Sequence, residues 1–138
     1  MNRRIFLQFT AASSVTGLVL PNVAQAKPQL AGGLYYTREA PGRWKGKEGG
    51  HVPKIQISKD KGTVRVQVIT AHEMNGCEHY IVKHIVLDGK YRFLDEHMFD
   101  PENDQEPVSL FSLGRYRGQI YVLSVCNKHD TWLNSTLV

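Results

Sequence analysis

The sequence has few of the features that identify disulfide-rich, repetitive or membrane-spanning proteins. It contains only two cysteines among 138 residues, so it can form neither a disulfide-dense scaffold nor a four-thiolate metal site. No internal repeat is present, which excludes solenoids and propellers. The hydrophobic fraction of 41% is near the globular average, and the length fits one domain.

A dense cluster of Lys and Arg with interleaved aromatic residues is also missing. The formal net charge is +4, and residues 1–26 contribute two of these charges, which leaves +2 for the rest of the chain. So weak a positive charge gives no support to nucleic-acid binding, and we expect no nucleic-acid partner.

Residues 1–26 have the layout of an export signal. Arg3 and Arg4 precede an apolar stretch over residues 5–20, and Ala24-Gln25-Ala26 forms a small-x-small cleavage site. The apolar stretch is too short and too interrupted to span a membrane, and we expect no span in the mature chain. The paired arginines resemble a twin-arginine signal, which implies export of a folded protein to the periplasm. An ordinary secretory signal that contains two arginines is the alternative.

The rest of the chain favours β-structure. Residues 27–50 are rich in Gly, Pro and charge, so we expect a loose N-terminal arm with one short strand at 34–37. Val64, Val66 and Val68 alternate within a predicted strand at 63–69 and should face the core. Further strands are expected at 55–58, 79–87, 90–94, 108–111 and 119–126. No segment has sustained helical periodicity, so residues 51–138 should form an all-β antiparallel sandwich.

Histidine is the one residue type with unusual potential for chemistry. The chain has six histidines, and Cys126 and His129 flank a predicted turn after a long strand. A Cys-x-x-His turn can direct a thiolate and an imidazole to one metal ion. A histidine at a strand end is nevertheless more often a surface residue, so this spacing alone does not establish a metal site.

Four short motifs carry a family resemblance. They are Gly50-His51-Val52-Pro53, His72-Glu73-Met74, Glu78-His79-Tyr80-Ile81 and Cys126-Asn127-Lys128-His129. In these motifs, and in their order, the sequence resembles the iron-binding domain of the superoxide reductases, the neelaredoxin and desulfoferrodoxin family. The resemblance covers roughly residues 48–132, most of the chain after the predicted signal.

The resemblance implies an immunoglobulin-like antiparallel β-sandwich of about seven strands and one iron ion held by four imidazoles and one axial thiolate. By motif match, the ligands are His51, His72, His79, His129 and Cys126. The implied reaction is reduction of superoxide to hydrogen peroxide with an electron from an external donor. The donor's identity is open, and exposed sandwich edges also leave a homo-oligomer open.

The sequence departs from the family pattern next to the first ligand. The family usually has Glu-Lys directly before this histidine, and the lysine attracts superoxide; Gly49 and Gly50 stand there instead. Lys47 and Glu48 lie just upstream and are the candidate catalytic residues, with solvated loop charges as the alternative. The missing lysine supports a second function, a non-catalytic iron redox protein or sensor. A metal-free immunoglobulin-like interaction module of periplasmic sulfur oxidation is the third.

The remaining histidines and cysteine match no ligand of the family. We expect His84 to be structural and His97 to lie on the surface. Cys77 allows two interpretations, a disulfide with Cys126 in an oxidising compartment or a partly buried, inert thiol. Asp130 stands where the family turn usually has Gly.

Overall fold

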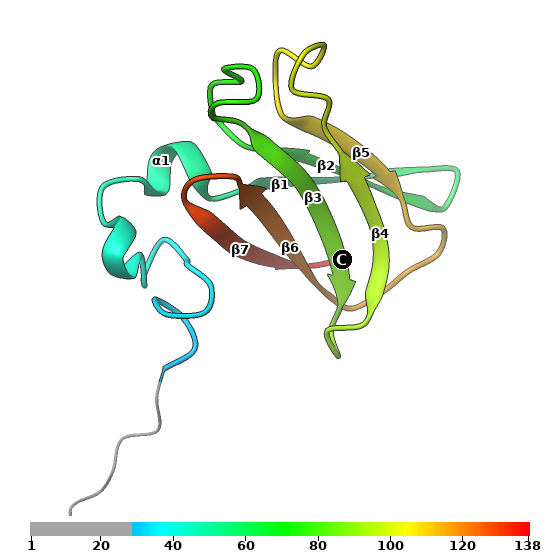
Figure 1. The fold of residues 1–138 in the computed structure, drawn as a ribbon. Helices are drawn as coiled ribbons and strands as arrows, with labels where there is room; N and C mark the ends of the chain where they lie inside the picture. Colours follow the sequence, from blue (N-terminus) through cyan, green and yellow to red (C-terminus); the bar gives the residue numbers. More distant parts are fainter. Residues whose placement is uncertain (1–28) are drawn as a thin grey trace, which may run out of the picture.

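The computed structural model describes residues 29–138, which form a two-layered β-sandwich (Figure 1). The expected export signal at residues 1–26 lies outside the described residues. Within them, seven strands pair in two antiparallel sheets, which confirms the predicted all-β sandwich. The strands are β1 (Lys54–Asp60), β2 (Thr63–Ile69), β3 (Ile81–Asp88), β4 (Phe93–Met98), β5 (Val108–Ser112), β6 (Gln119–Cys126) and β7 (Asp130–Leu137).

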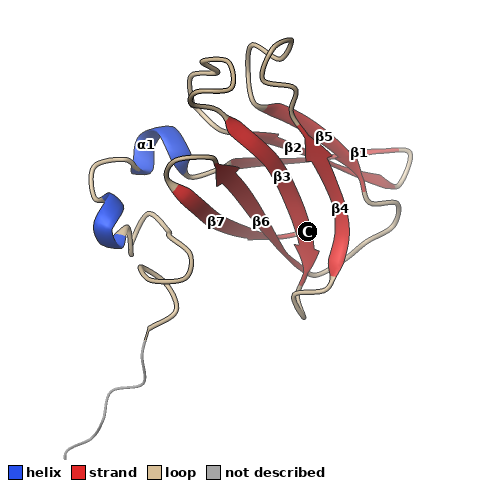
Figure 2. Cartoon of the chain, in the orientation of Figure 1, coloured by secondary structure: helices blue, strands red, loops and turns tan. Residues whose placement is uncertain are grey.

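The two sheets differ in size. One has three strands in the order β1-β2-β5, and the other has four in the order β4-β3-β6-β7 (Figure 2). The hairpin between β1 and β2 turns at Lys61 and Gly62, whose φ angles of 47° and 82° are both positive. A two-residue turn of this kind matches the twist of the flanking strands and sets their register.

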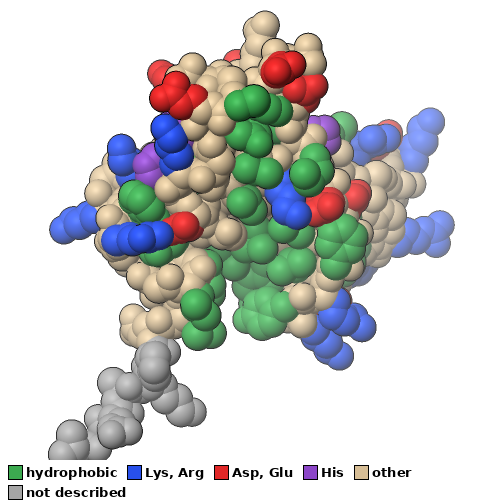
Figure 3. Space-filling view, in the orientation of Figure 1, with side chains coloured by type: hydrophobic (Ala, Val, Ile, Leu, Met, Phe, Trp, Pro, Cys, Tyr) green, Lys and Arg blue, Asp and Glu red, His purple; other side chains and the backbone are tan. Residues whose placement is uncertain are grey.

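The core lies between the sheets and is built from alternate residues of the strands. Val64, Val66 and Val68 of β2 are at most 2% exposed, as predicted, and pack with Ile120 and Val122 of β6. This alternation buries one face of each strand and leaves the other outside. The outer face of the four-stranded sheet also carries hydrophobic side chains, which Figure 3 shows gathered over it.

Several element boundaries differ from the predictions. β3 begins at Ile81 rather than at residue 79, the returning strand β4 covers 93–98 rather than 90–94, and β7 was not expected. The sequence of β7 mixes polar residues into both faces, so its alternation is weak. Two single helical turns also occur, η1 (Gly42–Trp44) and α1 (Glu48–His51), and both are too short to show helical periodicity.

The described part of the segment expected to be a loose arm packs against β7 through Tyr36. The ring of Tyr36 is 3% exposed and its centroid lies 5.6 Å from that of Trp132. Tyr36 donates its N–H to the Thr131 carbonyl at 2.9 Å and accepts the Leu133 N–H at 2.8 Å. The strand expected at 34–37 is therefore reduced to a single bridge beside β7.

Candidate metal centre

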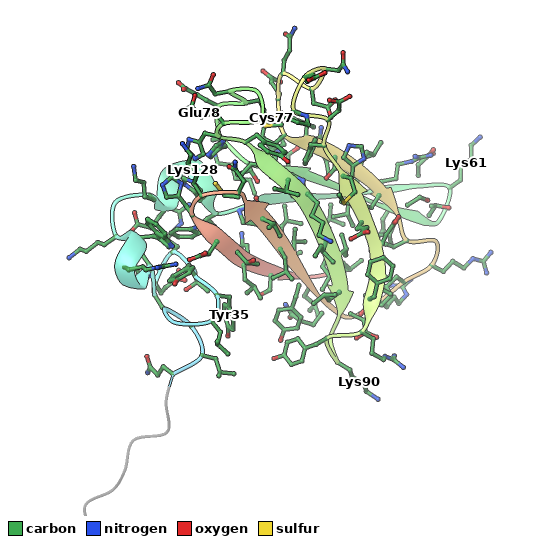
Figure 4. All side chains as sticks on the ribbon, viewed as in Figure 1. Tyr35, Lys61, Cys77, Glu78, Lys90 and Lys128 are labelled. Atoms are coloured by element: carbon green, nitrogen blue, oxygen red, sulfur yellow. The ribbon has the colours of Figure 1, made fainter. Side chains whose placement is uncertain are left out.

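Five side chains from three separate segments meet at one end of the sandwich. Each offers one ligand atom, and all five atoms lie within 4.8 Å of one another. They belong to His51, His72, His79, Cys126 and His129. Figure 4 shows Glu78 and Lys128 at this end of the molecule, away from the turns that carry Lys61 and Lys90. The five residues that the motifs single out as ligands therefore come together in space.

His51 reaches the cluster from the helical turn α1 rather than from a strand boundary. It is the last residue of α1 and is 4% exposed. Its Nδ1 donates to the carbonyl oxygen of Lys47 at 2.8 Å, one helical turn earlier. This bond leaves Nε2 as the nitrogen with a free lone pair, directed at the other histidines.

His72 and His79 come from the loop between β2 and β3. The His72 ring donates from Nδ1 to the carbonyl oxygen of Glu73, which again frees Nε2 for the cluster. Asn75 and His79 form an antiparallel bridge that closes the loop. The Glu73 side chain is exposed, so what Glu73 contributes to the cluster is its backbone carbonyl.

Cys126 and His129 come from the tight turn between β6 and β7. The Cys126 sulfur lies 3.8 Å from His72 Nε2 and 3.6 Å from His129 Nδ1. The Lys128 N–H donates to this sulfur at 3.5 Å. Trp132 donates its indole N–H to the His129 carbonyl at 2.8 Å, which holds the turn against β7.

Asn127 joins this turn to the loop that carries His79. Its Oδ1 accepts the Tyr80 N–H at 3.0 Å, and its Nδ2 donates to the Glu78 carbonyl at 3.0 Å. One amide side chain thus connects the residue after Cys126 to both neighbours of His79. No role was predicted for the Asn127 side chain, although its place between two ligands was a usable signal.

The spacing of the four ring nitrogens fits a central cation. His51 Nε2, His129 Nδ1, His79 Nε2 and His72 Nε2 follow one another at 3.0 Å. Three successive separations of 3.0 Å leave room for one ion at about 2.1 Å from each nitrogen, which is the length of a metal–imidazole bond. His129 Nδ1 and His79 Nε2 each lie 3.0 Å from two other ring nitrogens. An imidazole nitrogen has either one proton or one lone pair in the ring plane, so it cannot form hydrogen bonds with both neighbours. A cation at the centre satisfies all four lone pairs.

The surroundings keep these imidazoles neutral, as metal binding requires. Burial, reinforced by the neighbouring imidazoles, lowers the pKa of His51 to about 4. Burial also lowers the pKa values of His72, His79 and His129. Imidazole nitrogens and a thiolate are ligands that suit iron, so the residues present fit the metal that the family resemblance implies.

The two candidate catalytic residues lie beside the cluster rather than in it. Lys47 is exposed, and its positive charge is a smaller cause, after burial, of the lowered pKa values of His79 and His129. The Glu48 carboxylate accepts the Gly46 N–H at 2.9 and 3.0 Å, and this hydrogen bond lowers its pKa. Glu48 is therefore bound to its own loop, whereas Lys47 lies within electrostatic range of the site.

The other cysteine and histidines considered in the sequence lie outside the five-donor cluster. Cys77 and Cys126 are free thiols, and Cys77 is exposed rather than partly buried, because it occupies a protruding loop (Figure 4). The structure thus shows neither the disulfide nor the buried thiol considered for Cys77. His97 is exposed on β4, and His84 is fully buried, as expected of a surface and a structural residue.

Asp130 supports the Cys126–His129 turn through contacts that were not predicted from the sequence. The Asp130 carboxylate accepts hydrogen bonds from Arg43 and, at 2.8 Å, from the indole N–H of Trp44. The Trp44 ring in turn meets His129 edge-on, with centroids 4.7 Å apart. Asp130 has a φ of 61°, so the position usually held by Gly keeps the backbone conformation that favours Gly.

The comparisons with known proteins agree with this geometry. The family model described as Desulfoferrodoxin matches residues 42–135. The superoxide reductase of Thermococcus kodakarensis is 32% identical over 107 residues, which are 67% of this chain and 89% of that protein. That of Pyrococcus horikoshii is 30% identical with the same coverage. A solved superoxide reductase (neelaredoxin) from Ignicoccus hospitalis is 25% identical with a TM-score of 0.66, over 76% of this chain and 93% of that one.

In residues 29–138, no helix has the length and apolar character needed to cross a membrane. The described fold, the five converging donor atoms and the family match, which covers well over half of the sequence, lead to the same result. The chain belongs to the desulfoferrodoxin family, the superoxide reductase-like proteins that bind non-haem iron.

Proposed function

We propose that this chain is a superoxide reductase with one non-haem iron ion, held by His51, His72, His79, His129 and Cys126. The observation that carries the proposal is the convergence of four imidazoles and one thiol within 4.8 Å, from three separate segments. In the reaction, superoxide takes up one electron and two protons and becomes hydrogen peroxide. The electron comes finally from an external donor, whose identity is open.

Bound iron would supply the one-electron chemistry, and the protein's residues supply its setting. The backbone carbonyls of Lys47 and Glu73 orient the rings of His51 and His72 toward the centre. The Lys128 N–H donates to the Cys126 sulfur and so reduces the negative charge on it. Lowered imidazole pKa values keep the lone pairs free for metal at neutral pH.

Lys47 is proposed to attract superoxide, and Glu48 to hold the loop that presents it. The charge of Lys47 reaches His79 and His129, so it also favours the approach of an anion to the same end of the sandwich. The Gly46 N–H is shared between both carboxylate oxygens of Glu48, and this hydrogen bond stabilises the turn just before Lys47. This role differs from that of a catalytic residue, the role that the sequence offered Glu48 as a candidate for.

The proposed location is the periplasm, reached through a twin-arginine signal at residues 1–26. Export of a folded protein suits a centre whose Cys126 must bind metal before it meets an oxidising compartment. Replacement of Arg3 and Arg4 by lysine should leave the protein in the cytoplasm. Unchanged export of this variant would contradict the twin-arginine route.

Two single-cysteine variants test the function. Ferrous, iron-loaded protein is mixed with a superoxide pulse, and the visible spectrum and the peroxide yield are followed. We expect a rapid thiolate-to-iron charge-transfer band and one peroxide per iron. Cys126→Ser should lose the band and the reaction, whereas Cys77→Ser, which removes an exposed thiol outside the cluster, should keep both.

Gly50 stands directly before His51, where the family usually has Lys, and this favours a second candidate function. In it, the chain is an iron redox protein without superoxide reductase activity. A band that forms with ferricyanide but not with superoxide would support it. The third candidate, a metal-free interaction module, predicts that neither oxidant produces a band. The five-donor cluster argues against this candidate, because such a module has no need to bring five metal-binding groups together.

A further inference from the structure

Four polar side chains are buried between the two sheets, directly beneath the candidate metal centre. Their exposed fractions are 3% or less, in an interior that is otherwise mainly apolar. They are Thr70, His84, Ser109 and Ser124. Burying a polar group is unfavourable unless it is hydrogen-bonded, so a cluster of four requires an explanation.

These side chains form one continuous network centred on His84. Its Nδ1 lies 2.7 Å from Ser109 Oγ, and its Nε2 lies 2.9 Å from Thr70 Oγ1. Thr70 Oγ1 lies a further 2.9 Å from Ser124 Oγ. A neutral imidazole donates from one nitrogen and accepts at the other, so three hydrogen bonds can run along this chain in one direction.

The network is complete and joins the two layers. Among residues 29–138, no buried side-chain nitrogen or oxygen lacks a hydrogen-bond partner. Ser109 belongs to β5 of the three-stranded sheet, and Thr70 directly follows β2 of the same sheet. His84 and Ser124 belong to β3 and β6 in the other sheet. Because a fully satisfied buried network rigidifies its surroundings, it holds these two sheets at a set separation.

Two members of the network lie two residues before ligands. Thr70 precedes His72, and the His72 N–H donates to the Thr70 carbonyl at 2.8 Å. Ser124 precedes Cys126 on β6 and, like it, is buried between the layers. The hydrogen bond between Thr70 and Ser124 therefore connects, across the sandwich, the strand ends that carry His72 and Cys126.

We propose that the network of His84, Thr70, Ser109 and Ser124 positions His72 against Cys126 before metal binds. Without it, the metal alone would have to draw together a ligand of the three-stranded layer and a ligand of the four-stranded layer. His84 and its partners are positioning residues, since none contributes an atom to the five-donor cluster. This inference rests on the proposed metal centre but does not depend on superoxide chemistry.

Thr70→Val tests the inference, because it removes the hydroxyl and keeps the shape of the side chain. The matched control is Val66→Thr, the reverse change in the strand that Thr70 follows, which buries a hydroxyl in the apolar core away from the ligands. A second variant, Thr70→Ser, keeps the hydroxyl. Metal-free full-length protein is titrated with Co²⁺, and the affinity and the thiolate-to-cobalt charge-transfer band are recorded beside urea unfolding.

We expect Thr70→Val to weaken Co²⁺ binding by about 10- to 100-fold and to shift the band. Thr70→Ser should restore both, and Val66→Thr should lower stability while it leaves affinity and band unchanged. Thr70→Val with the affinity and band of the unmodified protein would overturn the inference. Absence of Co²⁺ binding by the unmodified protein would instead overturn the proposed metal centre, so the two failures are distinguishable.

Discussion

The two halves of the sandwich interior are built on different principles. The half away from the candidate metal centre is almost wholly apolar, with Val66, Ile120 and Val122 at 0% exposure. The half beneath the centre contains His84 and Ser124 at the same degree of burial. Each fully buried aliphatic side chain stabilises the fold by about 1.5–3 kcal/mol, whereas a buried hydrogen bond contributes about 0.5–1.5 kcal/mol net.

The two halves therefore have different roles, one mainly in the stability of the fold and the other mainly in the geometry of the site. An apolar core tolerates small rearrangements, because dispersion and burial depend weakly on direction. A hydrogen-bonded network holds its atoms at set distances, and loss of one partner leaves another polar group unsatisfied. The apolar half therefore supplies most of the folding free energy, and the polar half holds the ligand-bearing strand ends in place.

Metal binding should produce the largest difference between the two halves, because it stabilises the fold from the half that holds the ligands. Iron binds only the folded chain, so at a free concentration 1000-fold above its dissociation constant it stabilises the fold by about 4 kcal/mol. Iron should also slow the hydrogen exchange that occurs through local opening of the folded chain, mainly in the loops of residues 70–80 and 126–130. Denaturant unfolding with and without iron, together with exchange mass spectrometry, measures both effects. Equal protection of the β1–β2 hairpin would contradict the separation of the halves.

The sequence predicted the apolar half well and the polar half only in part. Val64, Val66 and Val68 alternate so regularly that their strand and its buried face could be identified from period two alone. The ligands were found through the four motifs, since residues as distant as His51 and His129 have no local signal that joins them. Hydrogen-bonded networks across sheets, such as that of Thr70 and Ser124, leave no periodic pattern in a sequence.

Two local features also escaped prediction for physical reasons. α1 comprises four residues and contains two glycines, so it is held by packing and by the His51 to Lys47 contact rather than by helix propensity. The described arm is ordered by long-range contacts, above all that of Tyr36 with Trp132. Glycine content and charge predicted a loose segment, because neither reports contacts between residues far apart in the sequence, such as Tyr36 and Trp132.

The next effect should appear when metal-free protein is acidified. Burial, and to a smaller degree the charge of His97, lowers the pKa of His84 to about 3, against about 6.5 in the unfolded chain. Between these values the unfolded state binds the extra proton, so stability falls as pH falls, by about 1.4 kcal/mol per pH unit. By pH 4.5 the contribution of His84 amounts to a loss of about 3 kcal/mol.

Urea unfolding of metal-free protein between pH 7.5 and 4.5 measures this dependence. His84→Leu should be less stable at neutral pH but should show a shallower decline with acid, because one titrating group is removed. His97→Leu serves as the control, because it leaves the buried His84 in place and should keep the steeper decline. Identical slopes for all three proteins would show that the polar half does not have this sensitivity to acid.

A smaller effect is expected from a charge placed at the rim of the site. Gly50 lies in α1, and a Cβ there would come no closer than 3.4 Å, to the Ala71 carbonyl oxygen. Gly50→Lys should raise the second-order rate constant with superoxide about 10-fold at low salt, by electrostatic attraction. Gly49→Lys adds the same charge one residue away, where a Cβ meets nothing within 4 Å. Stopped-flow kinetics in which both variants gain equally would mean that only net charge matters.

The smallest effect should come from the outer support of the Cys126–His129 turn. Asp130→Asn keeps a side chain that tolerates the φ of 61° and keeps one oxygen for the Trp44 N–H, but it loses the ion pair with Arg43. Because this pair is exposed, unfolding at pH 7 should become easier by less than about 1 kcal/mol. The difference should shrink in about 1 M NaCl, which screens surface charges. Loss of Co²⁺ affinity in this variant would instead mean that Asp130, through Trp44 and His129, belongs with the polar half that positions the ligands.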